Sequence, residues 1–125
     1  MQIYHPSKTP LPEDWLNLEE EVRIDLVKKS HEFASVEFEN GAIDLHSVIH
    51  VVVENQLAMK VVPVPETIAK LTRQGLSRHE AIHAIGAIIS ENLIEMMKNN
   101  QTHNAEKYRK RLNKLTAKRW SRGKY

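Results

Sequence analysis

The sequence predicts an all-α fold, a small single-domain bundle of four to five helices. Apolar residues recur at intervals of three or four along most of the chain, which is the helical period. The turn signals Asn40-Gly41, Gly75 and Asn99-Asn100 leave stretches long enough for helices between them. A length of 125 residues, with 41% hydrophobic and 27% charged residues, suits one domain with its own core.

The first helix is expected to begin at Pro12, after a lead-in at 5–12 that holds three of the five prolines. Its apolar stripe is Trp15, Leu18, Val22, Leu26 and Val27. The segment 31–39 shows no clear pattern and is assigned to neither helix nor loop. Residues 42–59 are rich in Val and Ile, as strands are, yet they also form a helical stripe. We favour a helix, because eighteen residues without a turn signal are long for a strand.

Three further helices are expected in the second half of the chain. A short one runs from Pro65 to about Gln74, with Gly75 directly after its end. The longest one opens after Ser77 and continues to about Lys98, with the core stripe Ile82, Ile85, Ile89, Leu93 and Met96 or Met97. The last one, at 104–120, has Tyr108, Leu112 and Leu115 on one side.

Composition excludes several classes of protein. The chain has no cysteine, so disulfides, thiolate nucleophiles and cysteine-ligated metal sites are absent. None of its four glycines falls in a phosphate-binding GxGxxG or GxxxxGK[ST] spacing. The first residues lack the features of a signal peptide, and the longest apolar runs are three residues, far short of a transmembrane segment. We therefore expect a cytoplasmic location.

Charge divides the chain into two parts. Residues 1–97 hold 8 Lys and Arg against 15 Asp and Glu, whereas 98–125 hold 10 Lys and Arg against Glu106 alone. We expect an acidic helical body at 1–103 and a basic C-terminal segment at 104–125.

The histidines suggest a metal site. Two spacings stand out, His46-x3-His50-x3-Glu54 and His79-Glu80-x-x-His83. On helices, residues four apart share a face, so each pair of imidazoles could bind one ion. Because these histidines adjoin the apolar stripes, burying them without partners would be costly, and a bound cation would remove that cost. We expect one divalent transition metal, with zinc first and Fe, Ni or Mn as alternatives. The expected ligands are His46, His50, Glu54, His79 and His83.

Glu80 has two interpretations. It could be the general base of a metal-dependent hydrolase, taking a proton from metal-bound water. Alternatively, Ser77-x-x-Glu80 is a capping box, in which Glu80 bonds back to the helix start. We favour the cap.

The motif His79-Glu80-x-x-His83-x-x-Gly86 resembles the start of the metzincin signature HExxHxxGxxH, although Ile89 stands where its third histidine belongs. This motif-level similarity to zincin metallopeptidases would imply metal-dependent hydrolysis. Segments 49–58 and 77–86 together resemble a family of small bacterial helical proteins, a domain of unknown function with paired HxxxHxxxE and HExxH helices. That resemblance implies a helical fold and no activity. A di-iron carboxylate bundle needs two Glu-x-x-His motifs, so a homodimer would have to supply the second.

For the basic C-terminal segment we favour a solvated helix, with Tyr108, Leu112 and Leu115 packed on the acidic body. The alternative function is a nucleic-acid or protein interaction module, with the histidines structural. Its aromatic residues Tyr108, Trp120 and Tyr125 could stack on bases. The cations expected to contact nucleic acid are Lys107, Arg109, Lys110, Arg111, Lys114, Lys118 and Arg119.

Overall fold

The protein is all-helical in the parts that the computed structural model describes, which are residues 1, 3–33 and 42–124. This confirms the predicted fold class. The described residues form seven helices and no strand, more helices than the four to five predicted: α1 (Pro12–Leu16), α2 (Glu20–Phe33), α3 (Ala42–Ala58), α4 (Val64–Arg73), α5 (Arg78–Asn99), α6 (Ala105–Lys114) and α7 (Ala117–Ser121). Most of segment 31–39, left unassigned from the sequence, lies outside the described residues.

The additional helices arise where an expected helix is divided in two. The helix expected from Pro12 stops at Leu16, and Arg23 of α2 donates hydrogen bonds to the carbonyl oxygens of Leu16 and Leu18 at 3.0 and 3.1 Å. The helix expected over 104–120 stops at Lys114, because Leu115 is extended and buried. Thr116 then caps α7 by accepting a hydrogen bond from the Arg119 backbone N–H.

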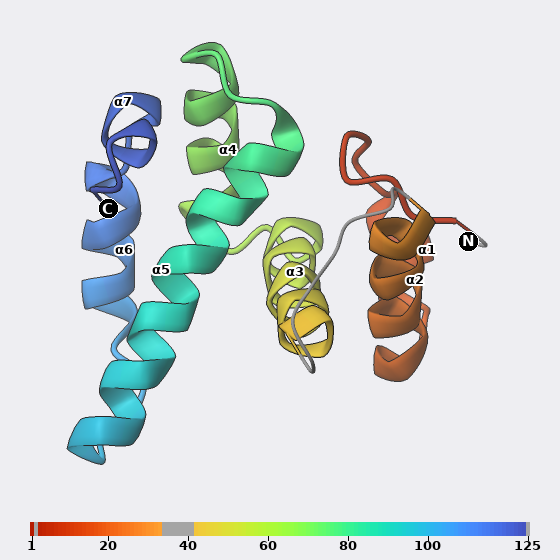
Figure 1. Cartoon of the computed structure of the whole chain (residues 1–125), viewed down its shortest axis with the longest axis horizontal. Helices are drawn as coiled ribbons and strands as arrows, with labels where there is room; N and C mark the ends of the chain where they lie inside the picture. Colours follow the sequence, from red (N-terminus) through yellow and green to blue (C-terminus); the bar gives the residue numbers. More distant parts are fainter. Residues whose placement is uncertain (2, 34–41, 125) are drawn as a thin grey trace.

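Helix α3 is the central element and packs against α1, α2, α4 and α5 (Figure 1). Helix α6 packs on α5 and α4. Two apolar clusters hold the bundle together, and α3 contributes to both, with Val51 in the smaller one and Val53 in the larger one. The smaller cluster contains Tyr4 and Trp15 besides residues of α2, so the N-terminal segment is packed onto the bundle.

The expected core stripe of α5 is fully buried only as far as Ile89. Ile82, Ile85 and Ile89 are buried and Leu93 is 43% exposed. Of the two alternatives at the end of the stripe, Met96 is half-buried and Met97 is 82% exposed. At Gly86, helices α5 and α3 pack too closely for a larger side chain, because a Cβ added there would lie 2.8 Å from Ile49 Cγ2 of α3. The last turns of α5 project beyond this crossing (Figure 1).

The described part of the basic C-terminal segment is attached to the larger core by Tyr108, Leu112 and Leu115. Lys70 of α4 also donates to the carbonyl oxygens of Leu112 and Asn113 at the end of α6. Among the described residues, no helix combines the length and apolar character needed to cross a bilayer.

Candidate metal centre

Five histidines from three helices converge at the centre of the molecule. We call this group the histidine cluster; it consists of His31, His46, His50, His79 and His83. Each residue offers one ring nitrogen, and these five atoms all lie within 4.8 Å of one another. The cluster could therefore hold a metal ion.

The local helical structure explains how four of these side chains meet. His46 and His50 are one turn apart on α3, and His79 and His83 are one turn apart on α5. Helices α3 and α5 pack together, which brings the His46 and His83 ring centroids to 4.9 Å and those of His50 and His79 to 5.1 Å. The structure thus brings together the four histidines that the two spacings singled out.

His31 of α2 is the fifth member, and the sequence analysis missed it. Its Nδ1 lies 2.8 Å from the Val27 carbonyl oxygen, which can only accept, so Nδ1 carries the proton. In the neutral ring Nε2 is then unprotonated, and it lies 3.1 Å from His46 Nε2. A backbone carbonyl that fixes the tautomer in this way is the usual support of a metal-binding histidine. No second histidine lies one turn from His31 on α2, so spacing gave no signal.

His50 is oriented by a tyrosine from the N-terminal segment. The Tyr4 hydroxyl donates a short hydrogen bond to Glu54 Oε2, so its oxygen is left to accept from His50 Nδ1, 3.1 Å away. Burial, followed by the charge of Glu54, raises the pKa of Tyr4, so the hydroxyl keeps its proton. His50 Nε2 is therefore the unprotonated nitrogen. It is buried and makes no hydrogen bond within the described structure.

Glu54, one of the five expected ligands, lies outside the histidine cluster. Its carboxylate oxygens accept hydrogen bonds from Arg78 Nη2 and Nη1 at 2.7 and 2.8 Å. The side chains of Glu54 and Arg78 are 1% and 10% exposed. Arg78 Nη1 also donates to the Pro6 carbonyl oxygen at 2.8 Å. Glu54 thus joins the N-terminal segment, α3 and the start of α5 beside the cluster.

Glu80 lies at the margin of the cluster. Ser77 caps α5 as expected, with its Oγ accepting from the Glu80 backbone N–H at 3.1 Å. The Glu80 side chain, however, accepts a hydrogen bond from Trp120 Nε1 at 2.8 Å, instead of one from the helix start. Its other oxygen lies 3.8 Å from His83 Nδ1. His83 Nε2, by contrast, is buried without a hydrogen-bond partner in the described structure.

The surroundings of the cluster keep the imidazoles of His46, His50, His79 and His83 neutral. Burial, and then the proximity of the other histidines, lowers the pKa of His46 and of His83 to about 4 and that of His50 to about 2. Burial also lowers the pKa of His79, whose position in the first turn of α5 further disfavours a positive charge. Neutral imidazoles hold a free lone pair, which is the form that binds metals.

The spread of the donors can be compared with the distances between ligands in a metal coordination shell. With metal–nitrogen bonds of ~2.1 Å, neighbouring donors lie ~3.0 Å apart in an octahedral site and ~3.4 Å apart in a tetrahedral one, and opposite octahedral donors lie ~4.2 Å apart. The His31–His46 separation of 3.1 Å matches neighbouring octahedral positions. All five nitrogens lie within 4.8 Å of one another, slightly farther than any pair in such a shell, so the side chains would draw together around an ion.

Comparisons with protein-family models, curated proteins and solved structures found no match for this chain. The similarities to zincins and to the small bacterial helical family therefore remain predictions from the motifs alone.

Proposed function

We propose that the protein binds one divalent transition metal ion through the histidine cluster. The supporting observation is that three of the converging ring nitrogens make no hydrogen bond within the described structure. His50 Nε2, His79 Nε2 and His83 Nε2 are all buried and make no hydrogen bond within the described structure. Each such atom costs ~1–3 kcal/mol of folding free energy, and coordination of a cation would remove that cost.

The donor set favours an ion that accepts five or six ligands. Five imidazoles are one more than a tetrahedral zinc site uses. Neutral nitrogen donors suit Fe(II) and Ni(II) better than Mn(II), which prefers oxygen. We therefore place Fe(II) and Ni(II) ahead of zinc, and five protein ligands would leave the sixth octahedral position open.

The same geometry argues for a supporting role of Glu80. A general base in an HExxH site must reach the water on the metal. Here one carboxylate oxygen is bonded to Trp120, and the other is nearest to Nδ1 of His83 rather than to the unpartnered Nε2. We propose that Glu80 acts through its hydrogen bond to Trp120, which joins α5 to α7, and that metal binding, rather than Glu80-dependent hydrolysis, is the primary function.

Elemental analysis of the purified protein tests the proposal. The protein is prepared without a polyhistidine tag or chelator and compared with the His50→Ala/His83→Ala double variant. We expect about one equivalent of a single transition metal in the unaltered protein and less than a tenth of that in the double variant. Circular dichroism establishes that the variant is still helical.

A matched control removes two histidines outside the cluster. His5 and His103 are both exposed, so the His5→Ala/His103→Ala variant should keep the full equivalent of metal. Equal metal content in the two double variants, or no metal uptake by the unaltered protein after reconstitution, would refute the proposal.

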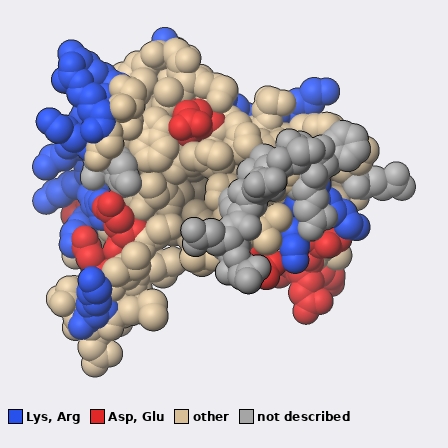
Figure 2. Space-filling view, in the orientation of Figure 1, with Lys and Arg blue, Asp and Glu red and all other residues tan. Residues whose placement is uncertain are grey.

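A second candidate function rests on the exposed cations of the basic C-terminal segment. Lys107, Arg109 and Arg111 are paired with Glu95, Glu106 and Glu91. Six other cations are exposed, with no acidic partner among the described residues: Lys110, Lys114, Lys118, Arg119, Arg122 and Lys124. Figure 2 shows Lys and Arg gathered on the side of the molecule where α6 and α7 lie. We propose that this surface contacts nucleic-acid phosphates.

The two described aromatic residues add little to that surface, and Tyr125 lies outside the described residues. Tyr108 is buried and donates to Gln56, and Trp120 packs on the larger core and donates to Glu80. Binding should therefore depend on charge and be independent of sequence. Affinity for an arbitrary duplex should fall steeply between 50 and 200 mM salt and be lost in Lys114→Glu/Lys118→Glu. An affinity that does not change with salt concentration would refute this second candidate.

A further inference from the structure

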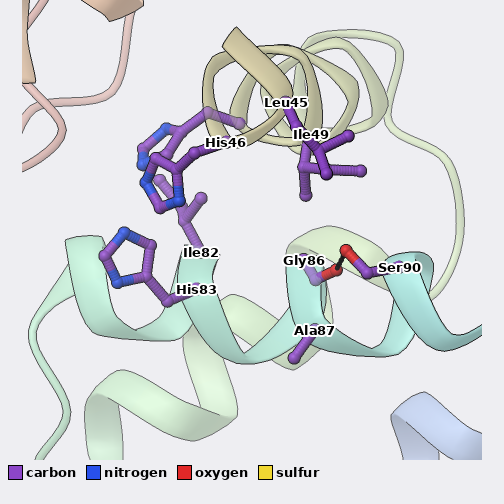
Figure 3. Close-up of a pocket in the computed structure, with 9 residues that line it drawn as sticks. Leu45, His46, Ile49, Ile82, His83, Gly86, Ala87 and Ser90 are labelled. Carbon is purple, nitrogen blue, oxygen red and sulfur yellow. Dashed lines mark hydrogen bonds between the residues drawn. The ribbon is translucent and has the colours of Figure 1, made fainter. Parts of the chain in front are cut away.

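The structure contains a cavity of about 360 Å³ beside the histidine cluster, between α3 and α5 (Figure 3). Its volume lies at the lower end of the range of ~300–1,000 Å³ typical of small-molecule sites. The lining residues are Leu45, His46, Ile49 and His50 of α3 and Ile82, His83, Gly86, Ala87 and Ser90 of α5.

The cavity is connected to one side of the cluster only. His46, His50 and His83 line it, whereas His31 and His79 do not. In Figure 3 the rings of His46 and His83 lie at one end of the cavity, with Ile49 and Ser90 toward the other end. An ion held by the five histidines would therefore face the cavity from one end.

Beyond the histidines, the walls are almost entirely apolar. Leu45, Ile49, Ile82 and Ala87 form most of them, and none of the lining residues that the structure describes has a charged side chain. The remaining polar side chain is that of Ser90, whose hydroxyl donates to the Gly86 carbonyl oxygen at 3.0 Å. Such walls suit the hydrocarbon part of a small ligand.

Charge indicates the head group of that ligand. Five neutral imidazoles leave both positive charges of a divalent ion uncompensated. The two carboxylates described beside the cluster do not join it, because Glu54 is paired with Arg78 and Glu80 is bonded to Trp120. An anionic oxygen donor in the open coordination position would supply negative charge that the described ligands do not.

We propose that the cavity binds a small monocarboxylate, with its carboxylate on the metal ion and its apolar body between α3 and α5. This inference rests on the proposed metal binding and adds a ligand class to it. If the inference is correct, the apolar part of the ligand contributes to affinity, because each buried CH₂ adds ~0.8 kcal/mol of binding free energy, or about a fourfold gain in affinity.

Titration of the Co(II)-loaded protein with octanoate and acetate tests the inference. Co(II) is the probe because its visible absorption changes when a ligand enters its coordination shell. Calorimetry should show octanoate binding at least tenfold more tightly than acetate, and the Co(II) spectrum should change as octanoate binds. Equal affinities, or an unchanged spectrum at saturation, would overturn the inference.

Two alanine substitutions provide the matched comparison. Ala87→Phe fills the cavity, whereas Ala69→Phe places the same side chain at an exposed position on α4. Both variants should keep one equivalent of Co(II), and only Ala87→Phe should weaken octanoate binding, by at least tenfold. If Ala87→Phe does not fold, Ser90→Leu narrows the other end of the same cavity.

The outcomes separate this inference from the proposed function. Failure of the unaltered protein to take up Co(II) refutes both. Full Co(II) uptake with no preference for octanoate, or with octanoate binding that Ala87→Phe leaves unchanged, refutes the monocarboxylate site and leaves metal binding intact.

Discussion

Breaking the buried Glu54–Arg78 pair should destabilise the fold more than most single substitutions. Two hydrogen bonds at 2.7 and 2.8 Å join side chains that are 1% and 10% exposed. Removing one partner of such a pair leaves a buried charge without compensation and costs ~3–5 kcal/mol. A chain of this length is stable by only about 6–19 kcal/mol, from ~0.05–0.15 kcal/mol per residue. Glu54→Gln alone should therefore remove a substantial part of the free energy of unfolding.

A double-mutant cycle measures this effect. Urea unfolding in the presence of a chelator is followed by circular dichroism for Glu54→Gln, Arg78→Met and the double variant. Each single variant should lose ~3–5 kcal/mol, and the double variant should lose less than their sum, because neither charge is then left alone. The exposed Lys29–Asp25 pair is the control, and Asp25→Asn should cost less than ~1 kcal/mol.

The cycle also separates the two roles considered for Glu54. If its carboxylate supports His50 through Tyr4, Glu54→Gln should keep one equivalent of metal at low temperature, with affinity lowered by ~10–100-fold. Metal loss as complete as in His50→Ala would make Glu54 a ligand. Single-variant losses under ~1 kcal/mol, or strictly additive losses, would refute the reasoning about the buried pair.

Four further predictions follow from the site and its supports. Tyr4→Phe leaves His50 Nδ1–H without its acceptor, so metal affinity measured by chelator competition should fall by ~10–100-fold; an unchanged affinity would contradict the hydrogen bond. Gly86→Ala places a Cβ 2.8 Å from Ile49 Cγ2, so urea unfolding should show a loss of ~1–3 kcal/mol, and a gain in stability would mean that α3 and α5 pack less closely than described. Leu112→Ala empties a fully buried position between α6 and the larger core and should cost ~2–5 kcal/mol in the same assay, whereas a detachable α6 would show almost no loss. Because His46 and His83 have lowered pKa values, the unfolded chain binds protons before the folded protein does as pH falls. The metal-free protein should therefore lose thermal stability from about pH 6.5 down to about pH 4, and a melting temperature that is flat over this range would disagree with the burial of the cluster.

Periodic patterns predicted the helices and four members of the histidine cluster. The prediction of a helix at 42–59 was the decisive step, because the side chains of His46 and His50 lie close enough to bind one ion only if the segment is helical. Ser77 as N-cap and the burial of Leu112 and Leu115 also followed from local patterns. Such features depend on residues only a few positions apart, so they can be predicted from a single sequence.

The remaining parts of the site depend on contacts between distant segments. His31 joins the cluster only because α2 packs on α3, and nothing in its neighbourhood along the chain marks it. Glu54 follows His50 at the same four-residue spacing that separates His50 from His46, so the spacing suggested a metal ligand. In the structure, however, its carboxylate pairs with Arg78, 24 positions away. Glu80 was expected to bond back to the helix start, and Trp120 of α7 binds it instead, 40 positions along the chain.

The five candidate ligands come from three separate stretches of a chain that has no cysteine. A bound ion would therefore also cross-link these stretches, as a disulfide would. Coordination would tie His31 to His46 across 15 positions and join both to His79. Closing a loop of 15 residues with a disulfide removes ~3 kcal/mol of unfolded-state entropy in the chain-entropy model, and an ion that holds the same residues constrains the unfolded chain in a comparable way. Metal availability would then set how long the protein survives proteases, as well as what it binds.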